Sequence, residues 1–283
     1  CVPDELIPYM GLLGSTLSLM DTKNYTYPEL TNEININCGG LATGTALYSD
    51  KVDFSKNTIV YEVKSKALYE KVPFVLGMME EIMYNTRFDD YKRLKEIIAR
   101  IKSRLEASLM GQGHSIAMLE CCAQFSESAY YSDILRGYKY YEFIKKLDEE
   151  FEQNKTQIVD KLNKLVGYIF NKDNVIVSLT ADDEGYDCFV KALSAKSCNI
   201  KDEHYNTAVR SFIPVNVKTG YTSASQVQYV ARCGNFVKDG YKYTGALKVL
   251  KVIFSYDYLW INVRVKGGAY GCMSGSSRNG DFY

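Results

Sequence analysis

An arginine and a tyrosine flank two glycines near the carboxyl end of the chain, in the run Arg264-Val265-Lys266-Gly267-Gly268-Ala269-Tyr270-Gly271. A tyrosine hydroxyl can donate a hydrogen bond to a developing oxyanion, and a planar guanidinium can hold a peptide backbone or a carboxylate. The default interpretation of Gly267-Gly268 is a helix stop, because glycine adopts positive φ at little cost. The nearby guanidinium and phenol favour a second interpretation, in which Arg264 and Tyr270 contact a substrate whose backbone approaches the glycines closely.

The rest of the chain contains no motif that could carry out a reaction by itself. The glycines lead out of a helix and lack a following Gly-Lys-Ser/Thr, which excludes a P-loop and a dinucleotide fingerprint. No serine lies in a Gly-x-Ser-x-Gly elbow. The two histidines, His114 and His204, are far apart and outside any zinc-protease motif. We expect His114 to have a structural or surface role and His204 to be solvated, so this chain by itself offers no zinc ligands.

Two further groups of residues have an ordinary structural interpretation. The carboxylate pairs fall on amphipathic segments, where a solvated helix face explains them: Glu80-Glu81, Asp89-Asp90 and Glu149-Glu150. The tyrosines between residues 130 and 141 could line a peptide groove, but helix packing is the favoured interpretation. Neither group indicates a catalytic centre.

Composition limits the classes of partner and the compartment. The chain has 283 residues, 46% of them hydrophobic, and its 34 Lys plus Arg equal its 34 Asp plus Glu, so no charge excess favours nucleic acid or an acidic membrane. The eight cysteines show no C-x-x-C spacing, and the adjacent Cys121-Cys122 would make a strained disulfide. We therefore expect reduced thiols in a cytoplasm-like compartment. Residues 247–265 form the longest apolar segment, but charged residues interrupt it, so no membrane span is predicted.

The elements that must position the Arg264–Tyr270 run are helices and a few strands. Helical periodicity predicts helices over residues 6–20, 28–38, 72–84, 89–109, 116–125, 138–151, 157–170, 187–195 and 244–263. Strand patterns cover residues 42–49, 58–66, 175–179, 210–217 and 226–231. Because strands and helices are segregated, we predict an α+β fold, an antiparallel sheet with helices packed on one face.

A polar connector at residues 198–206 predicts a boundary between one domain over residues 1–200 and a partial one over residues 201–283. The second domain begins with the element order strand, strand, helix, which weakly resembles the start of the first domain. Asn279-Gly280 predicts a hairpin turn, and the strand at residues 281–283 then stops without a returning partner. We therefore expect both ends to be cut from a longer chain.

The segment at residues 259–271 resembles the carboxyl-half signature of inverzincin metalloendopeptidases of the insulysin and pitrilysin type, closest to the presequence protease subfamily. Further similarities lie in Pro8-Tyr9-Met10, Tyr27-Pro28-Glu29-Leu30, Gly39-Gly40 and the stretch from Gln112 to Gly137. The Gly-Gly-Ala-Tyr-Gly signature is rather specific, and the other matches are individually weak.

The resemblance implies two halves, each of two homologous α+β domains, that close around a peptide substrate. In such enzymes zinc and the catalytic base come from an inverted His-x-x-Glu-His motif in the amino-terminal half, which this chain lacks. By motif position, Tyr270 would support the scissile carbonyl and its oxyanion, and Arg264 would orient the substrate. The resemblance implies a metalloendopeptidase-like domain followed by the truncated start of a second homologous domain. It also implies a location in a bacterial cytoplasm or an organelle matrix. This chain would be inactive without its amino-terminal catalytic half.

Two rival functions remain at this point. One is a non-catalytic scaffold or partner subunit of the same superfamily, which the retained Arg264 and Tyr270 argue against. The other is a free-standing helical binding module, which the abrupt strand at residues 282 and 283 argues against.

Overall fold

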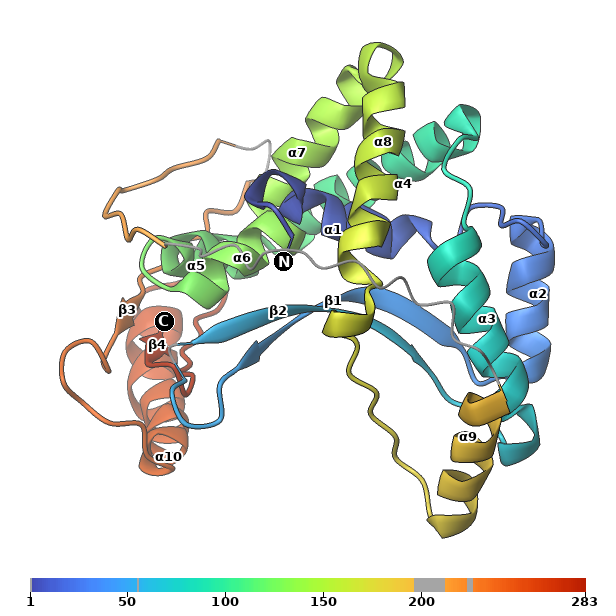
Figure 1. Cartoon of the computed structure of the whole chain (residues 1–283). Coiled ribbons are helices and arrows are strands. Elements are labelled where there is room, and N and C mark those ends of the chain that lie inside the picture. Colours follow the sequence, from blue (N-terminus) through green and yellow to red (C-terminus); the bar gives the residue numbers. More distant parts are fainter. Residues whose placement is uncertain (1, 55, 196–211, 223–225) are drawn as a thin grey trace. The chain divides into compact units, whose positions relative to one another are not determined.

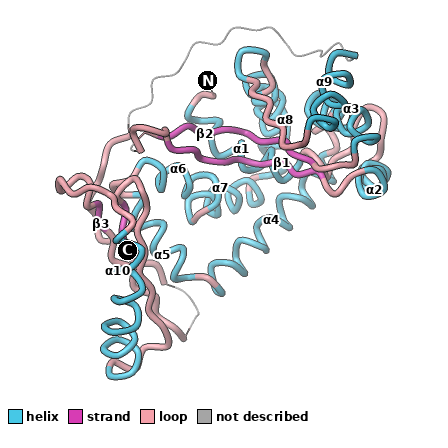
Figure 2. Tube along the Cα trace, turned by 90° about the horizontal axis from the view of Figure 1, so that it is seen from below, coloured by secondary structure: helices cyan, strands magenta, loops and turns pink. Residues whose placement is uncertain are grey.

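The computed structural model describes residues 2–54, 56–195, 212–222 and 226–283. Most of this trace is helical (Figure 2), and the strands form two small antiparallel two-stranded sheets, β1-β2 and β3-β4. The fold is thus helix-rich and compatible with the predicted α+β class. Residues 198–206 with His204 and the first two residues of the predicted strand at 210–217 lie outside the described residues.

The elements follow one another in this order: η1 (Asp4–Leu6), α1 (Ile7–Thr16), α2 (Tyr27–Asn37), β1 (Leu41–Ser49), β2 (Asn57–Ser65), η2 (Tyr69–Lys71), α3 (Val72–Asn85), α4 (Tyr91–Gly111), α5 (Gly113–Ala123), α6 (Glu127–Arg136), α7 (Tyr138–Glu149), α8 (Phe151–Ile169), η3 (Lys172–Asn174), α9 (Asp183–Ala195), β3 (Gly234–Asn235), α10 (Ala246–Ile253), the π-helix η4 (Phe254–Lys266) and β4 (Asp281–Phe282).

The chain separates into two compact units that each contain several chain segments. The first unit comprises residues 1–46, 60–105 and 140–210, and the second comprises residues 47–59, 106–139 and 211–283. The predicted pair of homologous domains, 1–200 and 201–283, stays a prediction. The run from Arg264 to Gly271 belongs to the second unit.

The first unit contains the buried apolar helix faces that the periodicity predicted. In α1 and its flanks, Leu6, Met10, Leu13 and Leu17 are all buried. The side chain of Thr43 in β1 donates a hydrogen bond to the carbonyl of Gly14 at 3.0 Å, so α1 lies against the strand (Figure 1). The α4 face is buried at Leu94, Ile97, Ile98 and Ile101. These faces form a conventional helical core.

Local signals in the sequence also set the start of α2. Thr26 and Glu29 form a capping box: the Glu29 carboxylate accepts from the Thr26 N–H at 2.9 Å and from its hydroxyl at 2.7 Å. Pro28 lies in the first turn, as predicted. After the helix, Cys38 already has an extended backbone, so the helix ends before the Gly39-Gly40 pair, and Gly40 adopts φ +115° directly before β1.

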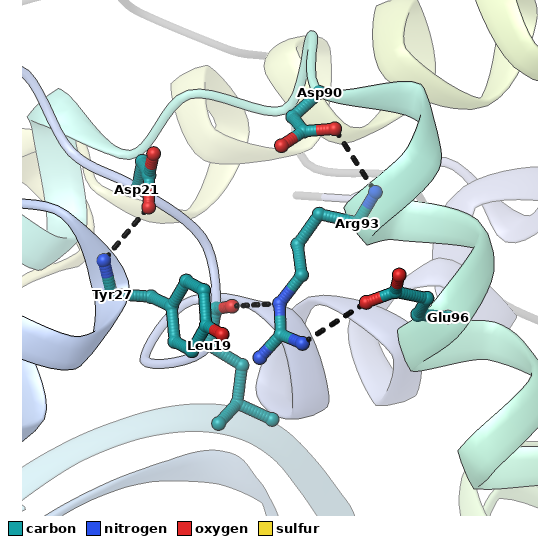
Figure 3. Close-up of polar contacts among 6 residues, drawn as sticks. All are labelled: Leu19, Asp21, Tyr27, Asp90, Arg93 and Glu96. Carbon is teal, nitrogen blue, oxygen red and sulfur yellow. Dashed lines mark hydrogen bonds and ion pairs between the residues drawn. The ribbon is translucent and has the colours of Figure 1, made fainter.

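Arg93 joins the start of α4 to the segments around α1 and α2 (Figure 3). Its guanidinium lies 3.9 Å from the centroid of the Tyr27 ring, its Nε donates to the Leu19 carbonyl at 3.0 Å, and its Nη1 donates to Glu96 at 3.3 Å. The Arg93 N–H also donates to the Asp90 carboxylate at 3.0 Å. Arg93 is thus a structural residue whose Nε and Nη1 groups are both bonded within the unit.

Three expectations about elements were wrong. Residues 175–179, 212–217 and 226–231 contain no strand within the described part of the chain, and α6 was not predicted. Ile176 and Val230 are 90% and 85% exposed. A β-branched composition favours extended backbone, but a strand also requires a neighbour to complete its hydrogen bonds.

The predicted hairpin at Asn279-Gly280 is confirmed, in a different turn geometry. Gly280 adopts φ +96°, its N–H donates to the Ser277 carbonyl at 3.1 Å, and the Ser277 N–H donates to the Asp281 carbonyl at 2.9 Å. This is a three-residue loop with glycine at its last position. The expectation that the following strand has no partner was wrong, because Gly275 and Tyr283 exchange two hydrogen bonds and β4 also pairs with β3.

Candidate functional site

The helix that leads to the site consists of α10 and the π-helix η4, and no side chain of either is buried. The predicted helix at 244–263 is therefore confirmed with shifted ends, and its second half has the wider π geometry. Its apolar stripe is exposed: Leu250, Phe254 and Ile261 are 55%, 41% and 41% accessible. The end of this helix thus lies on the surface of the second unit.

Gly267 and Gly268 end this helix. Gly268 adopts φ +72°, its N–H donates to the Arg264 carbonyl at 3.0 Å, and the Ala269 N–H donates to the Val263 carbonyl at 3.2 Å. A Cβ at Gly267 would lie 2.6 Å from the Val263 carbonyl oxygen, which is too close for any side chain. Both glycines are thus required by the backbone, and the helix-stop interpretation is confirmed.

The helix stop brings Arg264 and Tyr270 together. Arg264 Nη1 donates a hydrogen bond to the Tyr270 carbonyl at 2.8 Å. The guanidinium carbon lies 4.4 Å from the centroid of the Trp260 ring and 5.9 Å from that of Tyr270. Stacking on Trp260 and the bond to the loop therefore hold the guanidinium between two aromatic rings.

The polar atoms of this pair face solvent. Arg264 is exposed, and Tyr270 is 90% accessible. Within the described residues, no carboxylate lies within ion-pair distance of Arg264. One guanidinium N–H of Arg264 donates to the Tyr270 carbonyl in the loop, and other N–H groups can donate to an acceptor on a ligand. The Tyr270 phenol can donate or accept a hydrogen bond.

Trp260 is the residue of this site that the sequence reasoning missed. It precedes Arg264 by four positions, and residues at this spacing on a helix are neighbours. An aromatic side chain four residues before an arginine was therefore an available signal for a stacked guanidinium.

The other candidates from the sequence separate into exposed and structural residues. His114 is exposed near the start of α5, with its ring centroid 6.0 Å from that of Tyr229. Tyr131 and Tyr140 are buried in α6 and α7, which fits helix packing. Across the described ranges, no group of three or more His, Cys, Asp or Glu side chains could hold a metal ion.

The expectation of a solvated face was wrong for Glu81, which is 7% exposed. Its carboxylate accepts from the Asn24 N–H at 3.0 Å, the Asn24 amide at 2.8 Å and the Asn85 amide at 2.7 Å. Burial alone would raise the pKa of Glu81, but hydrogen bonds from Thr22, Asn85 and Asn24 outweigh it, so the pKa is lowered. Glu81 ties α3 to the segment before α2 and has a structural role.

Comparison with known proteins agrees with the carboxyl-terminal signature. A family model described as Peptidase M-16C associated matches residues 1–147, and one described as PreP C-terminal domain matches residues 220–282. No helix of the described chain is long and apolar enough to cross a bilayer.

Three relatives illustrate the similarity. The chain is 37% identical to Protein HypA of Clostridium perfringens over 287 aligned residues. This alignment covers 100% of the chain and 29% of that protein. It is 26% identical to Presequence protease 1, chloroplastic/mitochondrial, of Arabidopsis thaliana, over 94% of the chain and 25% of that protein. It is also 26% identical to the mitochondrial presequence protease of Yarrowia lipolytica, over 98% of the chain and 28% of that protein.

The chain thus spans less than a third of the length of these relatives. The first family model nevertheless matches 147 of its 283 residues, which is more than half. This chain belongs to the family of that first model, the associated region of the M-16C peptidases, and carries a PreP C-terminal domain signature.

Proposed function

We propose that this chain supplies part of the substrate-binding surface of a zinc-dependent endopeptidase that degrades short unfolded peptides. Its relatives include proteins named presequence proteases, which supports a peptidase activity for the whole protein. The observation that carries the proposal is the exposed pair at the helix end, with Arg264 bonded to the Tyr270 backbone and the phenol 90% accessible.

In this proposal Tyr270 acts on the reacting group. Its hydroxyl would donate a hydrogen bond to the oxygen of the scissile carbonyl, where negative charge develops during attack. The phenol is carried by a loop that Arg264 and the capped helix end hold in place. Preorganisation of this kind lets a donor stabilise the transition state without first rearranging.

Arg264 would orient the substrate. Its plane is set by the stack on Trp260, and its remaining N–H groups could bind a peptide carbonyl or a terminal carboxylate. A lysine at this position would keep the charge but lose the planar fork.

The described residues of this chain do not fit a zinc site. We therefore assign the metal and the catalytic base to an amino-terminal half of the same polypeptide, which would be the partner of this chain. We place such a protein in a bacterial cytoplasm or an organelle matrix, since relatives are named mitochondrial or chloroplastic.

The test is Tyr270→Phe in the full-length protein, measured as hydrolysis of a short unfolded peptide. Loss of one oxyanion donor should lower kcat by about 10²- to 10³-fold with little change in KM. Tyr241→Phe is the matched control, because Tyr241 is 69% exposed in the same unit but outside the loop, and it should leave kcat unchanged. Unchanged turnover in Tyr270→Phe would remove Tyr270 from the mechanism.

A further inference from the structure

A cavity of about 480 Å³ lies within the second unit, between residues of α5, α6 and the start of α7 on one side and the extended segment 212–219 on the other. This volume falls in the range of about 300–1,000 Å³ that is usual for small-molecule sites. The residues that line it are mostly apolar, with one acidic and one basic side chain among them. None of them belongs to the run from Arg264 to Gly271.

Gln124, directly after α5, holds the extended segment in place as one side of the cavity. Its backbone carbonyl accepts from the Val215 N–H at 2.7 Å, and its side-chain oxygen accepts from the Val217 N–H at 2.7 Å. Its side-chain amide donates to the Thr219 hydroxyl at 3.5 Å. This side of the cavity is therefore bonded to the helical side before any ligand binds, which lowers the ordering cost of binding.

Apolar side chains from both sides line the larger part of the cavity. The rings of Tyr130 in α6 and Phe212 in the extended segment lie with their centroids 5.4 Å apart. Ala123, Val215 and Val217 extend this apolar lining. Such a surface suits the aliphatic or aromatic side chains of a ligand.

Glu120 and Lys139 are the two charged residues of the lining. No ion pair joins them in the described part of the chain, because the Lys139 ammonium instead pairs with Asp133 at 3.4 Å. The ammonium also lies 4.8 Å from the centroid of the Tyr130 ring. Since an ammonium has three N–H donors, Lys139 can bind an anionic group of a ligand while it keeps its contact with Asp133.

The Glu120 carboxyl is incompletely paired. Its Oε2 atom is buried and has no hydrogen-bond partner among the described residues. Burial, and then the Asp133 carboxylate, raise the pKa of Glu120, while Lys139 acts in the opposite direction. A further positive charge beside Glu120 would lower this pKa and stabilise the carboxylate. A cationic donor on a ligand would therefore be favourable at this position.

We propose that this cavity binds a short apolar peptide of two or three residues with both ends free. The α-ammonium would bind Glu120, the α-carboxylate would bind Lys139, and the side chains would pack against Tyr130 and Phe212. A zwitterion is the best match because a ligand with a single charge would leave the other protein charge without a partner. The proposal concerns binding alone and does not depend on the peptidase activity proposed above.

The first experiment measures the binding of leucyl-leucine to the full-length protein at pH 7 by isothermal titration calorimetry. N-acetyl-leucyl-leucine and leucyl-leucine amide each lose one terminal charge, and each should bind at least about tenfold more weakly. Glycyl-glycine keeps both charges but lacks apolar side chains, and it should also bind at least about tenfold more weakly. Leucyl-leucine that fails to bind, or that binds no more tightly than any of these three analogues, would overturn the proposal.

Variants assign the binding to this cavity. Glu120→Gln should weaken leucyl-leucine binding about tenfold but leave N-acetyl-leucyl-leucine unaffected, because that analogue has no ammonium. Lys139→Met should likewise weaken leucyl-leucine but leave leucyl-leucine amide unaffected. Asp239→Asn and Lys242→Met are matched controls, because these exposed charged residues belong to the same unit but do not line the cavity, and they should change no affinity.

Lys139→Met also removes the ion-pair partner of Asp133, so urea denaturation is used to check its folding. If it does not fold, the comparison of leucyl-leucine with its amide on the wild-type protein decides the role of the carboxylate. Leucyl-leucine binding that Glu120→Gln leaves unchanged, or that the control variants weaken equally, would show that the peptide does not bind here.

Discussion

Arg93 and Arg264 make similar contacts in two different settings. Each guanidinium lies over an aromatic ring, Tyr27 at 3.9 Å and Trp260 at 4.4 Å, and each donates to a backbone carbonyl at 3.0 Å or less. Arg93 also pairs with Glu96, and its side chain is 19% exposed. Arg264 has no such carboxylate among the described residues, and it lies on an exposed helix end.

The difference separates a structural arginine from one whose free donors are available for the proposed substrate-binding role. In the first unit Arg93 Nε bonds the Leu19 carbonyl after α1, and its Nη1 bonds Glu96 of its own helix. In the second unit the contacts of Arg264 fix its plane and its loop but leave donor groups exposed. A side chain that is oriented but only partly paired is what a substrate-binding role requires.

The largest stability effect should come from Arg93→Ala. It removes a hydrogen bond from a charged group to a partly buried carbonyl and a stacked cation, which together should cost about 2–3 kcal/mol. Arg264→Ala is the matched control and should change the free energy of unfolding by no more than about 0.5 kcal/mol, because its contacts are exposed. Urea denaturation of both variants would measure this, and equal losses would remove the distinction between the two arginines.

Glu81→Ala should destabilise the first unit by about 2 kcal/mol, because it leaves the buried donors of Asn24 and Asn85 without their acceptor. The lowered pKa of Glu81 also sets a pH dependence. Since the folded pKa lies below the unfolded one, its stabilisation is fully present above about pH 4.5 and is lost as the pH falls through the folded value.

Urea titrations of wild type and Glu81→Gln between pH 7 and pH 3 would test this. The difference in the free energy of unfolding between wild type and Glu81→Gln should shrink as the pH falls. A difference that stays constant over that range would show that the carboxylate charge of Glu81 does not contribute.

A smaller effect is expected for Gly268→Ala. A residue with a Cβ at φ +72° is strained, so the helix end should lose about 1 kcal/mol although nothing lies near the added methyl. Gly271→Ala is the control, since its φ is not positive and it also has open space around the Cβ position. Amide hydrogen exchange at residues 263–270 should accelerate in Gly268→Ala only, and equal protection in both variants would contradict the strained helix stop.

Much of the fold could be predicted because it depends on local periodicity. The buried faces of α1 and α4, Pro28 in the first turn of α2 and the turn at Asn279-Gly280 each follow from residues within a few positions of one another. The helix stop at Gly267-Gly268 belongs to the same class. In each case the signal and the structure involve the same short segment.

The failures involve partners that are distant in sequence. Residues 175–179 have a strand composition but no neighbouring strand, and β4 was expected to be unpaired because its partner β3 could not be identified from composition. Glu81 was assigned to a solvated face because its donor Asn24 comes from a distant segment. The Arg264–Tyr270 pair was found because a short signature carries it, whereas its function stays a prediction.

The most direct test of the account is whether a substrate touches position 270. In the full-length protein, replacing Tyr270 by the photo-crosslinker p-benzoylphenylalanine and irradiating with a short unfolded peptide should give a covalent adduct. The same replacement of the exposed Tyr241 should give none. Adducts at 270 but not at 241 are the predicted result, and equal or absent adducts at both positions would contradict a substrate-binding role for this helix end.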